Sequence, residues 1–550
     1  MYNRVLLTQT YSSLQGLEVN IKLHFLDFLN LKNLGKARSG SRPRLLCFSL
    51  WTLKTSFFGT FLHFLYKMFR VFSRFSVGPA LVGVSATAVF STYANTHTFN
   101  APKIKTQPVL ETPAHAVQGE YDVAIVGGGI VGLATAREIL LRFPEKTVTV
   151  LEKETEVASH QTGHNSGVIH AGIYYAEGST MARCCVKGAD YIYQYAERYG
   201  LPAEKNGKLI CAPTEKDAPV LATLLERGTN NGVKGLEIVD SEWIKKREPA
   251  VDVHSALYSP NTGSADYGAI ARHYAKEINE SGRGRVQVQF EVDSIKYINE
   301  ANEVEIRGKE PKTMGLPKVV RAKHVITCAG LQSDRVAQLA DGAPKPQVLT
   351  FRGTYYQMKP EYRNITSMNI YPVPSGGGIP VGVHFTPTVN ERRGRQMIVG
   401  PGACVAFGRE AYSFFDYTLK DLWAMATHIG LWKFAFSNFD LAITEMYRDL
   451  NRNAFMNQAR KLIPTVTDDM VEESFAGVMA QVFHDDGKAA KDFILERKVL
   501  NGTTLHVRSA PTPACTASLA IAEEVVEYAA EDFEWGKGKK KRRKHSPFYD

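Results

Sequence analysis

A glycine-rich turn between a strand pattern and a helix pattern constrains this chain more than any other feature. Residues 121–126 read YDVAIV, a short apolar run with β-branched side chains, and residues 127–132 read GGGIVG. Residues 130–141 follow with helical periodicity, and residues 147–151 (TVTVL) form a second apolar run. The sequence therefore predicts a strand, a turn, a helix and a strand, with the pattern G-x-G-x-x-G at the end of the first strand.

This turn has the residues that the phosphates of a dinucleotide require. Gly127 permits the tight turn, Gly129 lets the backbone approach a pyrophosphate, and Gly132 lets the helix pack closely on the strand. The N–H groups at the helix N-terminus attract the anion. Glu152 ends the second strand, where its carboxylate can accept hydrogen bonds from ribose hydroxyls. Because its charge repels a 2′-phosphate, the pattern predicts FAD or NAD rather than NADP.

Two later segments favour FAD over NAD. Residues 325–334 (VITCAGLQSD) are typical of a strand that enters a turn of small residues, as expected for a chain that returns to the same cofactor. Residues 506–518 precede an apolar helix at 519–529, and small residues at its start leave backbone N–H groups open to stabilise negative charge on a reduced flavin. An ordinary capped helix is the alternative interpretation of this second segment.

The most specific pattern follows the acidic strand end. Residues 152–154 read EKE and residues 160–175 read HQTGHNSGVIHAGIYY. Further stretches of the same kind are GKL at 207–209, FRG at 351–353, NIYPVP at 369–374, GVHFTP at 382–387, GP at 400–401 and the run 506–518. On these residues the chain resembles the L-2-hydroxyglutarate dehydrogenases of the D-amino-acid-oxidase-like flavoprotein superfamily, over residues 122–529. It departs from the family pattern at Thr354, where an acid is expected, and at Met479, where animal members carry arginine.

The resemblance implies a reaction and a set of partners. The family oxidises L-2-hydroxyglutarate to 2-oxoglutarate with FAD, and the electrons then pass to a quinone or to a soluble acceptor. The alternative is another flavoprotein of the superfamily that oxidises an amino acid or glycerol 3-phosphate. The residues expected to bind FAD lie in the glycine turn, the acidic strand end, the loop that follows it and the later segments. They are Gly127, Gly129, Ile130, Val131, Gly132, Glu152, Lys153, Thr162, Gly163, His164, Asn165, Ser166, Val292, Ala329, Gly330 and Thr516.

Oxidation of a 2-hydroxy acid requires a base for the hydroxyl proton and groups that hold the carboxylates. Histidine suits the base, because its ordinary pKa of about 6.5 lies near the working pH. His170 and His384 are the candidates, and a structural role remains open for each. Charged and phenolic donors suit the carboxylates. The candidates are Tyr174, Tyr175, Lys208, Arg352, Tyr371 and Arg508.

The predicted fold is α/β, with an FAD-binding Rossmann-like domain interleaved with a second, substrate-binding domain that contains a mixed or antiparallel sheet. We assign about 120–200, 270–345 and 472–530 to the first domain, and about 201–269 and 346–471 to the second. Strands are expected at 286–297 and 319–328 and helix at 181–199. Residues 417–462 are helix-like, either as an insertion packed on the core or as a surface that dips into a membrane.

The two ends of the chain carry much of its net charge of +10. Residues 1–115 are basic, poor in acids and rich in Ser, Phe and Leu, as transit peptides are. Two alternatives stay open: residues 76–94 could be a membrane anchor, or the segment could be neither a transit peptide nor an anchor. Residues 536–550 form a basic tail with KKKRRK at 539–544. The body is then near neutral, which disfavours a nucleic-acid partner. We expect a mitochondrial protein that is peripherally associated with the inner membrane. We expect no metal site, because the seven cysteines show no C-x-x-C spacing.

Overall fold

The structure is a computed structural model that describes residues 117–310, 317–374 and 382–536. The predicted extension 1–115 and residues 537–550 of the predicted basic tail lie outside the described residues. Contacts divide the chain into two units, Met1–Val109 with Ala426–His428, and Leu110–Met425 with Ile429–Asp550. The second unit contains the two large sheets and the site.

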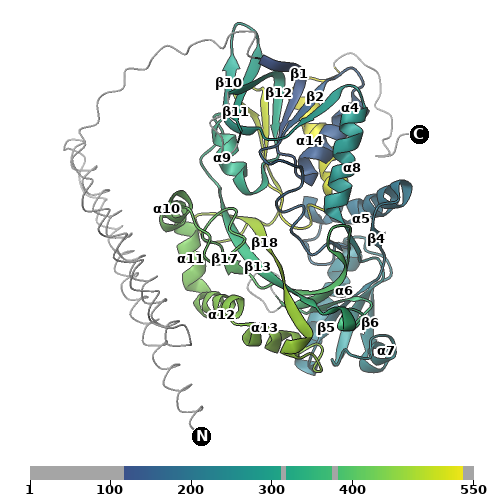
Figure 1. Cartoon of the computed structure of the whole chain (residues 1–550). Coiled ribbons are helices and arrows are strands. Elements are labelled where there is room, and N and C mark those ends of the chain that lie inside the picture. The colour runs from purple at the N-terminus through teal and green to yellow at the C-terminus, as the bar shows by residue number, and fades with distance from the viewer. Residues whose placement is uncertain (1–116, 311–316, 375–381, 537–550) are drawn as a thin grey trace, which may run out of the picture. The chain divides into compact units, whose positions relative to one another are not determined.

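An eight-stranded sheet is built around the strand that precedes the glycine turn (Figure 1). This strand, β1 (Val117–Val126), runs parallel to β2 (Val148–Leu151) and to β12 (Lys318–Thr327). The sheet continues through β9 (Gly284–Gln287), β10 (Glu291–Ile298), β11 (Glu303–Lys309), β19 (Ile494–Val499) and β20 (Thr504–Ser509). The predicted strand, turn, helix and strand are therefore confirmed.

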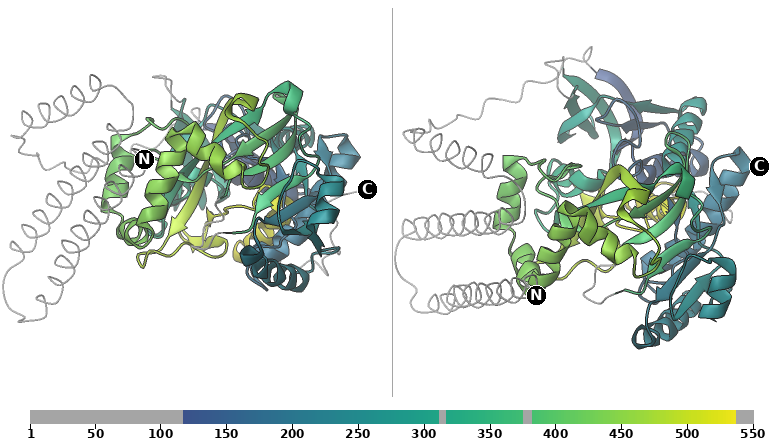
Figure 2. Two further views of the ribbon diagram at one scale, coloured as in Figure 1. Left: turned by 90° about the horizontal axis from the view of Figure 1, so that it is seen from below. Right: turned by 60° about the horizontal axis from the view of Figure 1, so that its bottom comes forward.

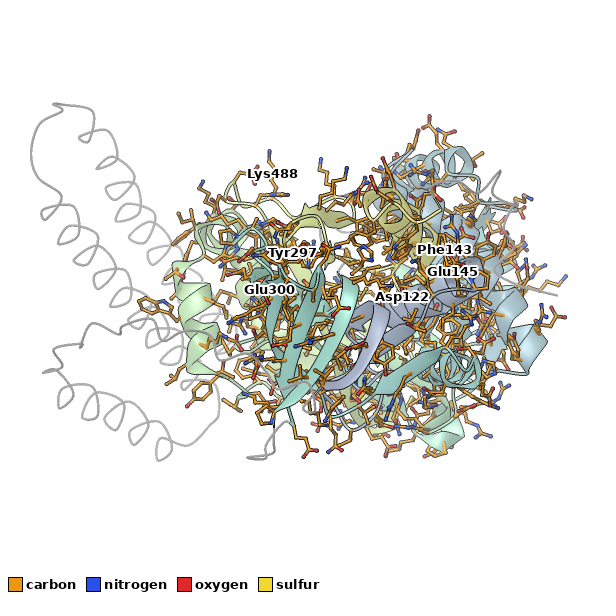
Figure 3. The ribbon with its side chains drawn as sticks, turned by 90° about the horizontal axis from the view of Figure 1, so that it is seen from above. Asp122, Phe143, Glu145, Tyr297, Glu300 and Lys488 are labelled. Carbon is orange, nitrogen blue, oxygen red and sulfur yellow. The ribbon has the colours of Figure 1, made fainter. Side chains whose placement is uncertain are left out.

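The second half of β1, residues 123–126 (VAIV), is buried on both faces, which explains why this part of the strand is a continuous apolar run. Val123 and Ile125 pack into the core formed with the helices, whereas Ala124 and Val126 pack toward β10, β11 and β12. The helices of the first core are α4 (Ile130–Arg142), α5 (Thr180–Tyr199), α8 (Tyr267–Glu280) and α14 (Ser518–Asp532), and α4 contacts both α8 and α14. Figure 3 shows Asp122, Phe143 and Glu145 at the end of the sheet where α4 connects to β2.

The prediction of one strand at 286–297 was wrong. The chain forms two strands there, because β9 pairs with β2 and β10 pairs with β11. Gln289, between them, has a φ of 56°. The N–H of Gln289 donates to the carbonyl of Glu154 at 2.8 Å, and the N–H of Phe290 donates to the carbonyl of Glu152 at 2.7 Å. The turn therefore fastens the start of β10 to the end of β2, next to the predicted ribose acid.

A nine-stranded mixed sheet forms the second layer of strands (Figures 1 and 2). Its pairs are antiparallel except for the parallel pair of β14 with β5. The strands are β5 (Lys208–Ala212), β6 (Glu237–Asp240), β7 (Ser255–Ser259), β13 (Gln347–Met358), β14 (Asn369–Pro372), β15 (His384–Asn390), β16 (Gly394–Gly400), β17 (Cys404–Val405) and β18 (Val471–Phe483). Strand β18 pairs with β13, although the predicted division assigned 472–483 to the cofactor domain. The exact domain division otherwise stays a prediction.

The smaller elements connect these layers. A three-stranded sheet consists of β3 (Val168–Ile169), β8 (Gly263–Ala265) and β4 (Ala203–Glu204). The short helices are α6 (Pro219–Asn230), α7 (Ser241–Arg247) and α9 (Ser333–Gln338). The predicted helix-like stretch contains α10 (Leu419–Thr427), α11 (Ile429–Ser437), α12 (Phe439–Leu450) and α13 (Arg452–Ala459). Phe455 and Met456 of α13 pack into the core of the nine-stranded sheet, as expected for an insertion packed on the core.

A buried ion pair fastens the segment after β12 to the second sheet. Asp334 at the start of α9 accepts hydrogen bonds from Arg409 (2.8 Å from Nη2) and from the N–H of Val348 on β13 (3.0 Å). Burial raises the pKa of Asp334, but the hydrogen bond and the charge of Arg409 outweigh burial and bring the pKa below its ordinary value of 3.8. The pair therefore stabilises the fold fully at pH values above 3.8, and this contribution is lost as the pH falls through the lowered pKa of Asp334.

We predict that Asp334→Asn lowers the free energy of unfolding by about 3–5 kcal/mol, because buried Arg409 loses its closest counter-charge and is left with the more distant Asp421, 4.0 Å from its Nε. Chemical denaturation followed by circular dichroism measures the change. Asp190→Asn, on the exposed face of α5, is the matched control and should change the free energy by less than about 0.5 kcal/mol. Equal midpoints for the two variants would contradict the role of the pair.

Candidate active site

One cavity of about 910 Å³ runs past the ends of the parallel strands β1, β2 and β12 to the strands β13, β14, β15 and β18 of the second sheet. The edge of a sheet at the carboxyl ends of its parallel strands is where α/β proteins bind nucleotides. The cavity therefore has a phosphate end at the glycine turn and a far end among side chains of the second sheet.

Glycines at two positions of the turn bring three segments into contact. Gly127 has a φ of 115°, and a Cβ there would lie 2.4 Å from the carbonyl oxygen of Cys328, after β12. A Cβ on Gly132 would lie 2.1 Å from the carbonyl oxygen of Gly127. Gly129 differs, since its Cβ would meet only Thr162 Oγ1, at 3.5 Å, and the residue lines the cavity. The third glycine thus leaves the room that a pyrophosphate needs against the helix N-terminus.

The acidic strand end is held in a fixed orientation. Glu152 is buried, and its Oε2 accepts the N–H of Gly128 at 2.7 Å while its Oε1 accepts the N–H of Glu154 at 2.8 Å. A carboxylate has about four acceptor positions, so ribose hydroxyls can still bind. Val292, on the strand that Phe290 fastens to Glu152, lines the same end of the cavity.

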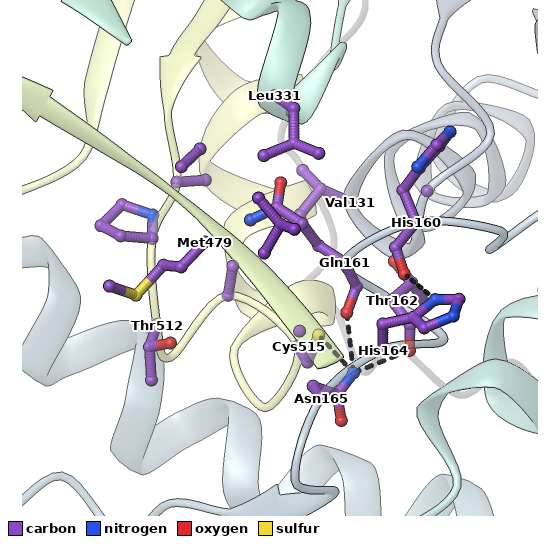
Figure 4. Close-up of a pocket in the computed structure, with 18 of the residues that line it drawn as sticks. Val131, His160, Gln161, Thr162, His164, Asn165, Leu331, Met479, Thr512 and Cys515 are labelled. Atoms are coloured by element: carbon purple, nitrogen blue, oxygen red, sulfur yellow. Dashed lines mark hydrogen bonds between the residues drawn. The ribbon is translucent and has the colours of Figure 1, made fainter. Parts of the chain in front are cut away.

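The loop at 160–166 is held by its own side chains (Figure 4). Thr162 Oγ1 accepts the N–H of Ile130 at 3.1 Å, which links the loop to the first turn of α4. Asn165 Nδ2 donates to the carbonyls of Gln161 (2.9 Å) and Thr162 (2.7 Å). His164 Nδ1 lies 3.2 Å from the carbonyl of His160 and donates to it. These bonds shape the wall of the cavity before any ligand binds.

A lysine supplies the cation for a cluster of acids on this wall. Glu154, His160 and Glu410 place one ligand atom each within 4.8 Å of one another, a spacing that a metal ion could use. Lys153 Nζ contacts all three: it pairs with Glu154, lies 3.1 Å from Glu410 Oε2 and lies 2.8 Å from His160 Nε2. The ammonium thus occupies the position between the acids.

Two histidines face the far end of the cavity. His384, at the start of β15, donates from Nδ1 to the carbonyl of Gly382 at 2.9 Å, and its Nε2 is buried with no hydrogen-bond partner among the described residues. His170 is partly exposed to the cavity, and its backbone N–H donates to Thr516 Oγ1 at 3.1 Å. Burial lowers the pKa of both histidines from the ordinary value of about 6.5 to about 3, so each ring is neutral at ordinary pH and keeps one nitrogen unprotonated.

Two arginines on the cavity wall already have carboxylate partners. Arg352 on β13 pairs with Asp449 of α12, and Thr354 Oγ1 donates to the same Asp449 at 2.8 Å. An acid therefore lies beside Thr354 although the sequence has none at that position. Arg508 on β20 pairs with Glu496 and donates to the carbonyl of Pro346 at 2.9 Å. Internal pairing leaves each guanidinium fewer free donors for a substrate.

Lys208 lies behind the cavity wall. It is buried on β5, and its Nζ is 3.5 Å from the centroid of the Tyr371 ring and 4.7 Å from that of Tyr174, two rings that line the cavity. The other face of Tyr371 stacks on His384, with ring centroids 3.8 Å apart and 16° between the planes. Lys208 itself is not a lining residue of the cavity, and its predicted role as a carboxylate ligand stays a prediction.

Most of the predicted site residues meet at this cavity, which supports the predicted set without testing the roles. Gly132, Gly163 and Lys208 do not line it. The residues that do are Gly127, Gly129, Ile130, Val131, Glu152, Lys153, Thr162, His164, Asn165, Ser166, His170, Tyr174, Tyr175, Val292, Ala329, Gly330, Arg352, Tyr371, His384, Arg508 and Thr516.

Tyr355 is a cavity residue that the sequence did not suggest. Its neighbour Arg352 on β13 also lines the cavity, and strict alternation would turn side chains three positions apart to opposite faces. The register of β13 with β18 shifts between Thr354 and Tyr356, which breaks the alternation. An irregularity of this kind leaves no local mark in the sequence.

Comparison with known proteins agrees with this geometry. A family model for FAD dependent oxidoreductases matches residues 122–528. The chain belongs to this family. Relatives of this FAD dependent oxidoreductase include the mitochondrial L-2-hydroxyglutarate dehydrogenases of Nematostella vectensis (44% identical over 75% of this chain and 91% of that protein) and Homo sapiens (40% identical over 78% and 92%).

Solved structures share the fold of this FAD dependent oxidoreductase. The FAD-bound L-alpha-glycerophosphate oxidase of Mycoplasma pneumoniae matches with a TM-score of 0.59 and 23% identity, over 74% of this chain and 94% of that one. The glycine oxidase of Geobacillus kaustophilus matches with a TM-score of 0.53 and 15% identity, over 75% and 95%. The cofactor is FAD, and the open face of Gly129 and the fixed carboxylate of Glu152 fit its pyrophosphate and ribose.

We predict that Gly129→Ala folds but binds FAD at least about tenfold more weakly, a loss of about 1.4 kcal/mol. The new methyl group meets no backbone, yet it enters the space that the pyrophosphate needs. Equilibrium dialysis measures the affinity, and thermal unfolding of the apoprotein is the control for the fold. Unchanged FAD affinity would contradict this assignment of the phosphate end.

Proposed function

We propose that this flavoenzyme oxidises L-2-hydroxyglutarate to 2-oxoglutarate. The observation that carries the proposal is the similarity to L-2-hydroxyglutarate dehydrogenases along nearly the whole length of those proteins, up to 44% identity over 91% of one of them. Bound FAD supplies the acceptor for the hydride from Cα of the substrate. The side chains of the far end bind the substrate, orient its C–H bond and receive the hydroxyl proton.

His384 is the base in this proposal. Its Nδ1–H is committed to the carbonyl of Gly382, which leaves the lone pair of Nε2 as the acceptor. That atom is buried and has no hydrogen-bond partner among the described residues, so a substrate hydroxyl would satisfy it. His170 also faces the cavity, but no hydrogen bond of its ring within the described residues selects one nitrogen as acceptor.

The carboxylates of the substrate meet phenolic and cationic groups. Tyr174, Tyr175 and Tyr371 line the far end, and burial raises the pKa of each phenol, so all three keep the O–H that donates to a carboxylate. Arg352 lines the same end, and its pairing with Asp449 fixes the guanidinium in place. Arg508 is the remaining predicted ligand, although its pairing with Glu496 favours a structural role.

The names of the relatives support a mitochondrial location, because these proteins are named as mitochondrial dehydrogenases. A quinone or a soluble molecule as the electron acceptor stays a prediction. No helix within 117–310, 317–374 and 382–536 is both long and apolar enough to cross a bilayer. Peripheral association with the inner membrane stays a prediction.

We predict that L-2-hydroxyglutarate bleaches the flavin of the purified holoenzyme under anaerobic conditions, whereas D-2-hydroxyglutarate, glycine, L-proline and glycerol 3-phosphate do not. A site that orients one C–H bond toward the cofactor distinguishes the two enantiomers. Stopped-flow absorbance measures the reduction. Faster reduction by an amino acid or by glycerol 3-phosphate would favour the alternative function.

A second prediction concerns the base. His384→Ala should retain FAD and slow flavin reduction by about 10²–10⁴-fold, because proton removal loses its acceptor. His254→Ala, an exposed position outside the cavity, is the control and should reduce at the wild-type rate. If His384→Ala reduces the flavin at the wild-type rate and His170→Ala does so slowly, His170 is the base instead.

A further inference from the structure

The buried lysine behind the cavity wall has no anionic partner within residues 117–310, 317–374 and 382–536. Lys208 is 2% exposed, and among the residues that the structure describes it makes neither a hydrogen bond nor an ion pair through its side chain. Its contacts are the rings of Tyr371 and Tyr174. Burial of an isolated ammonium is costly unless a counter-charge or deprotonation relieves the cost.

None of the ionisable groups around Lys208 can provide that counter-charge near neutral pH. Burial raises the pKa of the neighbouring thiols and phenols and lowers the pKa of the neighbouring histidines to about 3, so all of them are uncharged. These groups are Cys211 on β5, Cys185 on α5, Tyr371 on β14, His384 on β15, and Tyr174 and His170 on the connecting chain. Burial lowers the pKa of Lys208 to about 7, which makes it the one group of this cluster that titrates near neutrality.

The lysine is nevertheless close to the place where a substrate binds. Lys208 Nζ and the His384 ring both lie less than 4 Å from the centroid of the Tyr371 ring. Because one face of the ring has no room for both groups, they lie on opposite faces. Lys208 is therefore separated from His384, which lines the cavity, by the thickness of one aromatic ring. A charge on Lys208 is therefore felt at His384 and at the wall of the cavity. A negative charge in the cavity acts equally on Lys208 and favours its protonated form.

We propose that, above neutral pH, Lys208 is mostly uncharged while the cavity holds no substrate and takes up a proton when a dicarboxylate binds, so that binding and proton uptake are coupled at this amine. The inference rests on the proposed function, because the dicarboxylate brings the negative charge that the resident groups lack. The proton comes from solvent, adds to the lone pair of Nζ and returns to solvent when the product leaves. The ring faces of Tyr371 and Tyr174 stabilise the ammonium once it forms.

A neutral amine near the substrate could in principle accept the proton of the substrate hydroxyl, but the coupling assigns Lys208 a different proton. With the dicarboxylate bound, Lys208 already carries its proton and cannot receive the one from the substrate hydroxyl. His384 Nε2 remains the acceptor. Lys208 is thus a positioning residue, whose charge, once the proton is taken up, holds the bound dicarboxylate through the Tyr371 ring.

Isothermal titration calorimetry of the oxidised holoenzyme with glutarate, a dicarboxylate without the reacting hydroxyl, tests the proposal. Titrations in two buffers of different ionisation enthalpy give the number of protons taken up. We expect uptake that approaches one proton per site at about pH 8.5 and little uptake at about pH 6, with affinity that falls by up to about tenfold per pH unit above neutrality. Glutarate that binds at about pH 8.5 without proton uptake would overturn the inference.

Variants assign the proton to the lysine. Lys208→Met and Lys208→Arg should both abolish the uptake, since the first has no amine and the second carries a permanent charge. Lys205→Met, at an exposed position three residues earlier, should keep it. Uptake that persists in Lys208→Met would assign the proton to another group, and the wild-type titration decides the question if the variants do not fold. If glutarate does not bind and L-2-hydroxyglutarate leaves the flavin oxidised, the proposed function fails instead.

Discussion

The structure depends on the close approach of three backbone segments at the glycine turn. Gly127 touches the carbonyl after β12, and Gly132 touches Gly127, so any side chain at either position would push β1, α4 and β12 apart. This contact sets the floor of the cavity. Gly129 lies between the two tight glycines and is open on the cavity side, which is why the same turn both packs the core and leaves room for a pyrophosphate.

The two ends of the cavity differ in how their polar side chains are paired. Near the glycine turn, Lys153 is surrounded by Glu154, His160 and Glu410, and Glu152 is held by two backbone N–H groups. The arginines of the wall have carboxylates of their own. At the far end, by contrast, the buried Nε2 atom of His384 has no hydrogen-bond partner among the described residues. The Lys208 amine there lies against the rings of Tyr371 and Tyr174. Buried polar groups of this kind can be satisfied by a polar ligand.

The sequence predicted the parts of the fold and site that local patterns encode. The glycine spacing and the acid at Glu152 predicted the nucleotide half, and the resemblance in 160–175 and 382–387 predicted which histidines face the cavity. The sequence did not predict partners that come from distant segments. Asp449 reaches Arg352 from a helix 97 residues away, and the shifted register of β13 turns Tyr355 inward. Lys208 shows the same limit, because burial behind Tyr371 depends on tertiary packing rather than on its neighbours in the chain.

A crystal structure of the FAD-loaded protein is the most direct test of the central claim that one cavity joins the glycine turn to the two histidines. The account predicts that a ribose hydroxyl of the cofactor lies within hydrogen-bond distance of Glu152 and that the flavin ring lies at the end lined by His170 and His384. A cofactor bound with its ring away from both histidines, or with its ribose out of reach of Glu152, would contradict it.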